Sequence, residues 1–191
     1  MKKLGLLLIG FIAVGSFSSC MKDGDPFDPS VQYEIEKELI EEYVMQHLPN
    51  ATFNEDWGVW YELVSIGNRA EYEYKIIDNR LEAPTVQVKY TGKLLNGTVF
   101  DEQKDDDGIE FSLGGNLIQA WPLAFFPKEI GDVEVGGLTP SGLYPGAVIR
   151  FVTPSYLAYG NQQNGTIPPN SPLDFYIEVL DVTAPNNTSG N

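Results

Sequence analysis

The side chains that most suggest a functional site lie in one loop, over residues 154–177. This loop is dense in proline, glycine and asparagine and connects two strand-like runs, yet it carries Tyr156, Leu157, Tyr159 and Ile167. A solvated connection has no need of such large side chains. We therefore expect the loop to line a site.

The groups that perform covalent or metal chemistry are sparse. The sequence holds a single histidine, His47, and a single cysteine, Cys20. Without a second histidine or cysteine a metal role for His47 is not expected, and it is interpreted as a surface or capping residue near a helix end. The run 105–108 (Asp-Asp-Asp-Gly) lacks the alternating ligand order and the terminal glutamate of a calcium loop, which predicts a solvated loop. No metal and no cofactor are expected.

The composition predicts one domain with appendages. The chain has 191 residues and is 42% hydrophobic, enough for one well-buried core. Its 12 Lys and Arg against 27 Asp and Glu give a net charge of -15. That charge argues against nucleic acid as a partner and against a basic patch that adsorbs to an anionic membrane.

Residues 1–19 have the pattern of a targeting segment. Two lysines precede an apolar run over 4–14 that is too short for a comfortable membrane span. Cys20 follows directly and resembles the lipid-accepting cysteine of a bacterial lipoprotein. An ordinary secretory signal is the alternative, which the lack of a second cysteine disfavours. We expect an extracytoplasmic protein that acyl chains (palmitate among them) on Cys20 attach to the cell envelope, at the outer membrane, with the leaflet left open.

A helix is predicted after a short tether over 20–29. Asp28 and Pro29 have the form of an N-cap followed by proline at the first helical position. Apolar side chains then recur at helical spacing at Ile35, Leu39, Ile40, Tyr43, Val44 and Leu48. The pattern predicts an amphipathic helix over 30–48 that packs on its own domain, with a dimer contact as the alternative.

The rest of the chain predicts strands around one short helix, an α+β class. Val86, Val88 and Tyr90 alternate onto one face of a strand over 84–92, and Asn96-Gly97 is a hairpin turn. Further strand-like runs occupy 57–64, 72–77, 98–101, 109–114, 148–153 and 173–182. The short helix is expected over 116–126, with Pro122 tolerable only in its first turn.

Six strings in this part of the chain resemble, in order, the FK506-binding-protein (FKBP) type of peptidyl-prolyl cis-trans isomerases. They lie at 88–101, 111–114, 117–121, 157–160 (Leu-Ala-Tyr-Gly), 167–170 (Ile-Pro-Pro-Asn) and 172–179. One such string would be weak, whereas six in sequence are strong. The resemblance covers 84–183 and implies a twisted antiparallel half-barrel sheet wrapped over a short helix. It leaves 30–83 as an N-terminal helix and aromatic extension, and 184–191 as a flexible tail.

The resemblance also implies a pocket. Its floor would be Trp121, its rim Asp101, Tyr159 and Ile167, and its walls Tyr90, Phe100, Phe111, Leu117, Ile118 and Phe175, with Ile109 as an alternative to Phe111. The Ile118 backbone N–H and the Tyr159 hydroxyl would hold substrate carbonyls, while Asp101 would organise the polar edge. Taken singly, the aromatic residues could be core residues, Asp101 a turn cap and Tyr159 an anchor of its own loop.

These residue types fit the reaction that the resemblance implies. Rotation about an X-Pro amide has a barrier of about 18–20 kcal/mol because it breaks resonance, and it needs no nucleophile or base. An apolar aromatic box favours the twisted amide, whose charge separation is reduced, over the planar amide that water solvates better. The implied partners are proline-containing envelope or exported polypeptides and FK506-like macrolides. The alternatives are a chaperone or peptide-binding module with little turnover and a structural lipoprotein.

One departure from the family pattern lies over 125–146. The chain has about a dozen extra residues there before its next strand. The insertion is interpreted as a flap, a partner contact or a surface loop. The acidic residues 105–107 predict weak binding of peptides with Asp or Glu before proline.

Overall fold

The frame of the molecule is a seven-stranded antiparallel sheet, seen in a computed structural model that describes residues 27–185. The order is β1 (Thr52–Asn54), β2 (Val59–Ile66), β10 (Ala147–Thr153), β11 (Leu173–Thr183), β5 (Thr85–Leu94) and β6 (Val99–Gln103), and β7 (Ile109–Ser112) also pairs with β5. The predicted signal segment 1–19 and Cys20 lie outside the described residues, as does most of the predicted tether and tail. No helix of the described part is long and apolar enough to cross a membrane.

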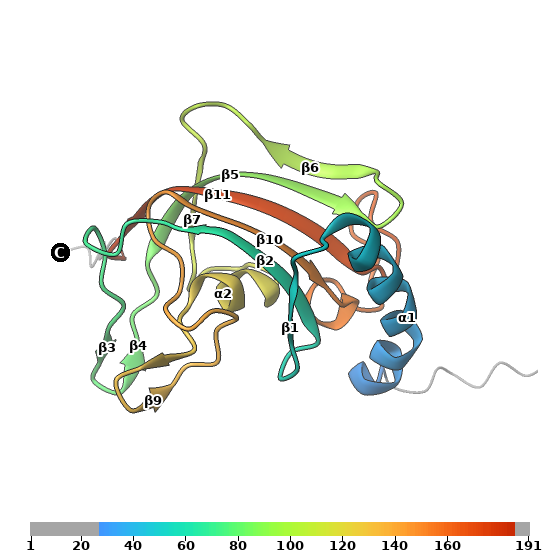
Figure 1. Ribbon diagram of the computed structural model, residues 1–191, viewed down its shortest axis with the longest axis horizontal. Helices are drawn as coiled ribbons and strands as arrows, with labels where there is room; N and C mark the ends of the chain where they lie inside the picture. Colours follow the sequence, from blue (N-terminus) through green and yellow to red (C-terminus); the bar gives the residue numbers. More distant parts are fainter. Residues whose placement is uncertain (1–26, 186–191) are drawn as a thin grey trace, which may run out of the picture.

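The sheet curves over one short helix, as predicted. In Figure 1 the strands β2, β10, β11 and β5 arch side by side over α2, which spans Ala120–Phe125. Val86, Val88 and Tyr90 of β5 are buried on the face that meets α2, in agreement with the predicted alternation. The helix is shorter than the predicted 116–126, and Pro122 lies in its first turn, where a missing N–H costs no helical hydrogen bond.

The N-terminal helix α1, over Pro29–His47, lies at one end of the sheet and packs against its opposite face there. Its start is the predicted cap, because Asp28 Oδ1 accepts hydrogen bonds from the N–H groups of Ser30 (2.9 Å) and Val31 (3.4 Å). Adjacent residues of a strand point to opposite faces. Accordingly, Phe151 of β10 enters the core around α2, whereas Val152 packs against α1.

The predicted apolar stripe of α1 is partly wrong. Ile40, Tyr43, Val44 and Leu48 are buried, but Ile35 is 68% and Leu39 is 52% exposed. The side chain that occupies the inner face one turn before Ile40 is Glu36, which is only 3% exposed. A polar partner on the facing loop, Ser155, explains why a carboxylate replaces an apolar side chain there.

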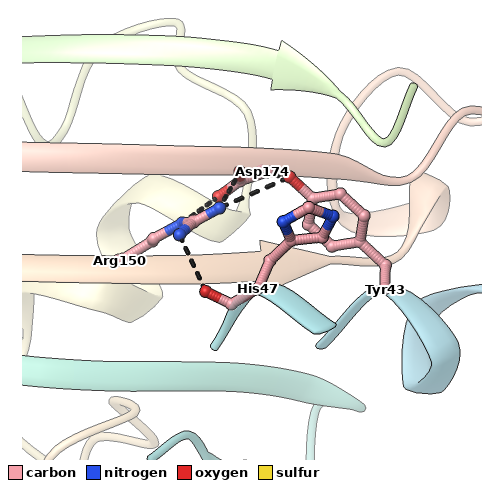
Figure 2. A network of polar contacts seen from close by, with 4 residues as sticks. All are labelled: Tyr43, His47, Arg150 and Asp174. Carbon is pink, nitrogen blue, oxygen red and sulfur yellow. Dashed lines mark hydrogen bonds and ion pairs between the residues drawn. The ribbon is translucent and has the colours of Figure 1, made fainter. Parts of the chain in front are cut away.

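Tyr43 and His47 of α1 meet the sheet through a polar cluster, drawn in Figure 2. The Arg150 guanidinium of β10 donates to both carboxylate oxygens of Asp174 on β11, at 3.0 and 2.8 Å, and to the His47 carbonyl at 3.1 Å. The Tyr43 hydroxyl donates to the same carboxylate at 2.8 Å. Arg150 thereby satisfies a carbonyl at the C-terminal end of α1, which the helix itself leaves unpaired. The His47 side chain is exposed, as predicted.

The predicted N-terminal extension joins the sheet only in part. β2 pairs with β10, and β1 pairs with β2 to form the edge of the sheet on that side. The predicted strand over 72–77 is wrong except at β3 (Ile76–Ile77), which pairs with β4 (Arg80–Leu81) in a separate small ribbon. Tyr74 instead leaves the strand path to enter the core, where its hydroxyl donates to the Leu143 carbonyl at 2.6 Å.

The insertion over 125–146 is partly built into the core. It begins with a hairpin of β8 (Glu129–Ile130) and β9 (Val133–Glu134). It then returns beneath α2, where the Leu138 N–H donates to the Leu123 carbonyl at 2.8 Å and the Leu143 N–H to the Phe125 carbonyl at 3.0 Å. Leu138 and Leu143 are buried, so this half of the insertion supports α2.

Candidate active site

A cavity of about 490 Å³ opens between α2, the strands β5 to β7 and the loop after β10. It is lined by Tyr90, Phe100, Asp101, Phe111, Asn116, Leu117, Ile118, Trp121, Ala158, Tyr159, Asn164 and Phe175. These include every residue predicted for the pocket except Ile167. A second hollow, of about 470 Å³, lies between α1 and residues 168–172 and contains none of the predicted residues.

Trp121 lies at the centre of the first cavity. It is the second residue of α2 and is 4% exposed. The rings of Tyr90, Phe111 and Phe175 surround it with centroids at 5.2, 5.1 and 5.9 Å and interplanar angles of 85°, 74° and 85°. Edge-to-face contacts of this kind hold each ring in one orientation. The result is a rigid aromatic floor.

Phe100 closes the side of the cavity formed by β6. Its ring lies 5.7 Å from that of Phe175 at 82°. It passes over Gly92 of β5, where an added Cβ would lie 2.5 Å from Phe100 Cζ and 3.1 Å from Phe175 Cε1. Only glycine leaves room for both rings at this position.

Tyr90 and Asp101 form the polar edge of the cavity. The Tyr90 hydroxyl donates to Asp101 Oδ2 at 2.5 Å. Burial, and next the hydrogen bond to Asp101, raise the pKa of Tyr90 well above its ordinary value, so the hydroxyl keeps its proton. Burial, with the nearby Asp101 charge, also raises the pKa of Tyr159. Both tyrosines therefore stay hydrogen-bond donors at neutral pH.

Two further donors belong to residues that line the cavity, Ile118 and Tyr159. Neither the Ile118 backbone N–H nor the Tyr159 hydroxyl donates a hydrogen bond to another group within residues 27–185. Ile118 lies just before α2, and Tyr159 follows the short 3-10 helix η1, over Ser155–Leu157. A bound peptide could present carbonyl oxygens to these two groups.

Ile167 is the one predicted pocket residue that does not line the cavity. Ile167 is buried in the core, and its backbone exchanges hydrogen bonds with Asn164 at 2.8 and 3.0 Å. This tight turn places Asn164 in the cavity instead. Of the two alternatives for the wall, Phe111 lines the cavity, whereas Ile109 is 40% exposed outside it.

Sequence reasoning missed Asn116, Ala158 and Asn164. Asn116 and Ala158 each adjoin a residue that was predicted, Leu117 and Tyr159, so their neighbourhood was the available signal. Asn164 precedes Gly165, a pair typical of tight turns, but a turn pattern does not tell which way its side chain points.

No group of His, Cys, Asp and Glu within residues 27–185 is arranged to hold a metal ion. In the acidic loop, Asp106 instead accepts from Lys89 Nζ at 2.8 Å and forms an exposed ion pair. The residues that line the cavity supply aromatic surfaces, hydrogen-bond donors and the Asp101 carboxylate.

Comparison with known proteins gives this arrangement a family. The model of the FKBP-type peptidyl-prolyl cis-trans isomerase matches residues 80–180. FK506-binding protein 4 of Neurospora crassa is 36% identical over 98 residues, which are 51% of this chain and 18% of that protein. A probable FKBP-type peptidyl-prolyl cis-trans isomerase of Haemophilus influenzae is 36% identical over 127 residues, 65% of this chain and 43% of that protein. The chain thus spans less than half of either curated relative.

A solved structure is similar over more of the chain. The crystal structure of FkpA from Escherichia coli superposes with a TM-score of 0.58 and 26% identity, covering 82% of this chain and 62% of that one. The likeness therefore extends beyond the region that the family model matches. Since that model covers more than half of the chain, including every residue that lines the cavity, the chain belongs to the family of FKBP-type peptidyl-prolyl cis-trans isomerases.

Proposed function

We propose that this protein catalyses the cis-trans isomerisation of X-Pro peptide bonds, with the aromatic cavity as its active site. The observation that carries the proposal is the ring of aromatic side chains around Trp121, which forms an apolar floor beside unpaired hydrogen-bond donors. A proline ring fits such a box by size and apolarity, and burial of its apolar surface favours binding by about 25 cal/mol per Å².

The cavity would act by binding the twisted amide better than the planar one. In the planar amide, resonance separates charge between oxygen and nitrogen, and water stabilises that charge. The floor around Trp121 excludes water from the proline side of the bond, which disfavours the planar form relative to the twisted form. No bond to a heavy atom is made or broken, so no nucleophile is required.

The donors at the rim would hold the peptide while its bond rotates. The Ile118 N–H and the Tyr159 hydroxyl would bind substrate carbonyl oxygens and so hold the peptide in the cavity. Asp101 accepts from Tyr90 and keeps the polar edge ordered. The roles of these residues are part of the proposal.

A protease-coupled assay with a leucyl-prolyl peptide tests the activity. We expect the protein to accelerate the slow cis-to-trans phase, and FK506 to suppress that acceleration by occupying the same cavity. FK506 binding without catalysis would replace the proposal with a peptide-binding or chaperone module. If the protein showed neither FK506 binding nor catalysis, the proposal would be refuted.

We also propose that the enzyme works outside the cytoplasm, anchored to the bacterial envelope through a lipidated Cys20 and acting on envelope or exported proteins. The support is the lysine-led apolar segment that ends at this cysteine. Detergent phase separation tests it. Wild-type protein should enter the detergent phase and Cys20→Ala the aqueous phase, whereas equal partitioning of both would contradict the anchor.

A further inference from the structure

Glu36 is a buried carboxylate in a helix that lies outside the region matched by the family model. It is 3% exposed, although glutamate is rarely buried without partners. Its Oε2 accepts from the Ser155 N–H at 2.8 Å, and its Oε1 accepts from the Ser155 hydroxyl at 2.5 Å and from Gln32 Nε2 at 2.7 Å. The carboxylate thus joins α1 to the first residue of η1.

Ser155 connects Glu36 to the rim of the cavity through further hydrogen bonds. Its carbonyl accepts hydrogen bonds from the N–H of Ala158 at 2.9 Å and from the N–H of Gly160 at 2.8 Å. These two residues flank Tyr159. Glu36 fixes the amide and hydroxyl of Ser155, and the Ser155 carbonyl fixes the backbone on both sides of the rim tyrosine.

A second contact of α1 supports the same loop. The rings of Tyr33 and Tyr156 meet edge to face with centroids 6.1 Å apart. The Tyr156 hydroxyl donates to the Trp57 carbonyl at 2.6 Å, which ties η1 to the turn before β2. The loop that carries Tyr159 is therefore held from its outer side by residues that precede the family domain.

We propose that Glu36 is a positioning residue for the isomerase site, which acts through Ser155 to hold the Tyr159 hydroxyl at the rim. The inference rests on the proposed function and deepens it. It assigns to the N-terminal helix a part in catalysis that residues 80–180 do not supply by themselves. A tyrosine misplaced by about 1 Å would bind the peptide carbonyl poorly, and errors of that size cost up to about a hundredfold in rate.

The test compares full-length Glu36→Ala and Glu36→Gln with Tyr43→Phe as the matched control. Tyr43→Phe also removes a hydrogen bond between α1 and the sheet, to Asp174, but at a point that does not touch η1. Amide hydrogen exchange by NMR reports on the loop, and kcat/KM for a leucyl-prolyl peptide reports on the site. Urea unfolding gives the stability of each variant.

We expect Glu36→Ala to speed exchange of the Ala158 and Gly160 amides at least about tenfold and to lower kcat/KM about five- to tenfold. Glu36→Gln keeps one acceptor oxygen and should show smaller changes in both amide exchange and kcat/KM. It provides the test if Glu36→Ala does not fold. Tyr43→Phe should change neither. Unaltered exchange in Glu36→Ala, or the same acceleration in Tyr43→Phe, would overturn the proposal.

A double variant shows whether the effect passes through Tyr159. In a Tyr159→Phe background, Glu36→Ala should lower kcat/KM by less than about twofold, because the group that it positions is gone. If Glu36→Ala still lowered kcat/KM about five- to tenfold in the Tyr159→Phe background, the proposal that Glu36 acts through Tyr159 would be overturned. If the wild type has no isomerase activity, the proposed function fails, while exchange at Ala158 and Gly160 still decides whether Glu36 holds the loop.

Discussion

At the scale of single residues, the polar edge of the cavity depends on the hydrogen bond from Tyr90 to Asp101. The bond is 2.5 Å long and lies beside the rim tyrosine, Tyr159. The phenol is protonated throughout the neutral range, and burial raises the pKa of Tyr90 so that it also donates at alkaline pH and holds one carboxylate oxygen in place. Asp101, which lines the cavity, is thereby held in one orientation.

We therefore predict that Tyr90→Phe lowers kcat/KM about five- to tenfold, the effect of losing one charge-assisted hydrogen bond. The ring is kept, so the aromatic floor and the fold should survive, as judged by near-ultraviolet circular dichroism. Tyr176→Phe is the control, because Tyr176 lies on β11, is 38% exposed and does not line the cavity. Equal loss in both variants would contradict a special role for the pair.

The types of the cavity residues could be predicted from the sequence, but not all of their directions. The aromatic residues lie in strings with strong local patterns, and the structure places all of them around one cavity. Ile167 was expected at the rim and is buried in the core, because the direction of a loop side chain depends on contacts far along the chain. Glu36 gave no signal at all, since its partner Ser155 is 119 residues away.

At the scale of elements, α1 meets the sheet at an ion pair between β10 and β11, to which Tyr43 and the His47 carbonyl of α1 hydrogen-bond. The Asp174 side chain is 3% exposed, and that of Arg150 is 27% exposed. Removing Arg150 leaves the buried Asp174 carboxylate without its counter-charge, which costs more than removing both members.

Arg150→Met should accordingly lower the free energy of unfolding by about 3–5 kcal/mol, and the double variant Arg150→Met with Asp174→Leu should recover most of that loss. Lys75→Met is the control, because Lys75 and Glu73 form an exposed pair worth at most about 1 kcal/mol. Urea titrations give the four values. A double variant no more stable than Arg150→Met would show that the pair does not act as a unit.

The elements themselves were predicted best where local signals decide them. The start of α1 follows from the Asp28 cap, and the alternation in β5 follows from its buried face. The predicted strand over 72–77 failed because Tyr74 enters the core between Leu143 and the aromatic residues around it, a contact with the insertion. The face of α1 that meets the sheet was misjudged at Ile35 and Leu39, because helical spacing does not say where a partner such as Ser155 lies.

At the scale of the whole molecule, several tyrosines link stability to alkaline pH. Burial is the main cause that raises the pKa of Tyr43, Tyr72 and Tyr156 to about 12, from an ordinary value of 10.0. In the unfolded chain these groups lose their protons near pH 10, while in the folded protein they keep them. The stabilisation is therefore complete below pH 10 and is lost as pH rises toward 12.

We predict that the free energy of unfolding falls steadily between pH 10 and 12. Tyr43→Phe should make this fall less steep, because one of the linked groups has been removed. Urea unfolding at several alkaline pH values measures the slope. An equal slope in wild type and variant would contradict the contribution of Tyr43.

The acidic charge of the molecule predicts a substrate preference. With a net charge of -15 and the run 105–107 close to β6, peptides with Asp or Glu before proline should be repelled. We expect kcat/KM for a glutamyl-prolyl peptide to be at least about fivefold below that for a leucyl-prolyl peptide at low salt, with the gap narrowing at high salt. Faster turnover of the acidic peptide would refute this preference.

The architecture of the whole molecule was predictable only within the family strings. The half-barrel and its helix followed from residues 84–183, whereas the pairing of β2 with β10 and the return of the insertion beneath α2 did not. Such pairings join segments that are distant in sequence, and local patterns specify them weakly.

The most direct test of the account is the isomerisation of a leucyl-prolyl peptide by wild type, Trp121→Leu and Trp60→Leu. Trp121 is the floor of the cavity, whereas Trp60 packs with α1 on the opposite face of the sheet. Both variants should stay folded, and only Trp121→Leu should lose most of its kcat/KM, by at least about tenfold, because the surface that favours the twisted amide is gone. Full activity in folded Trp121→Leu would contradict the account, since the aromatic cavity would then not be where the bond is turned.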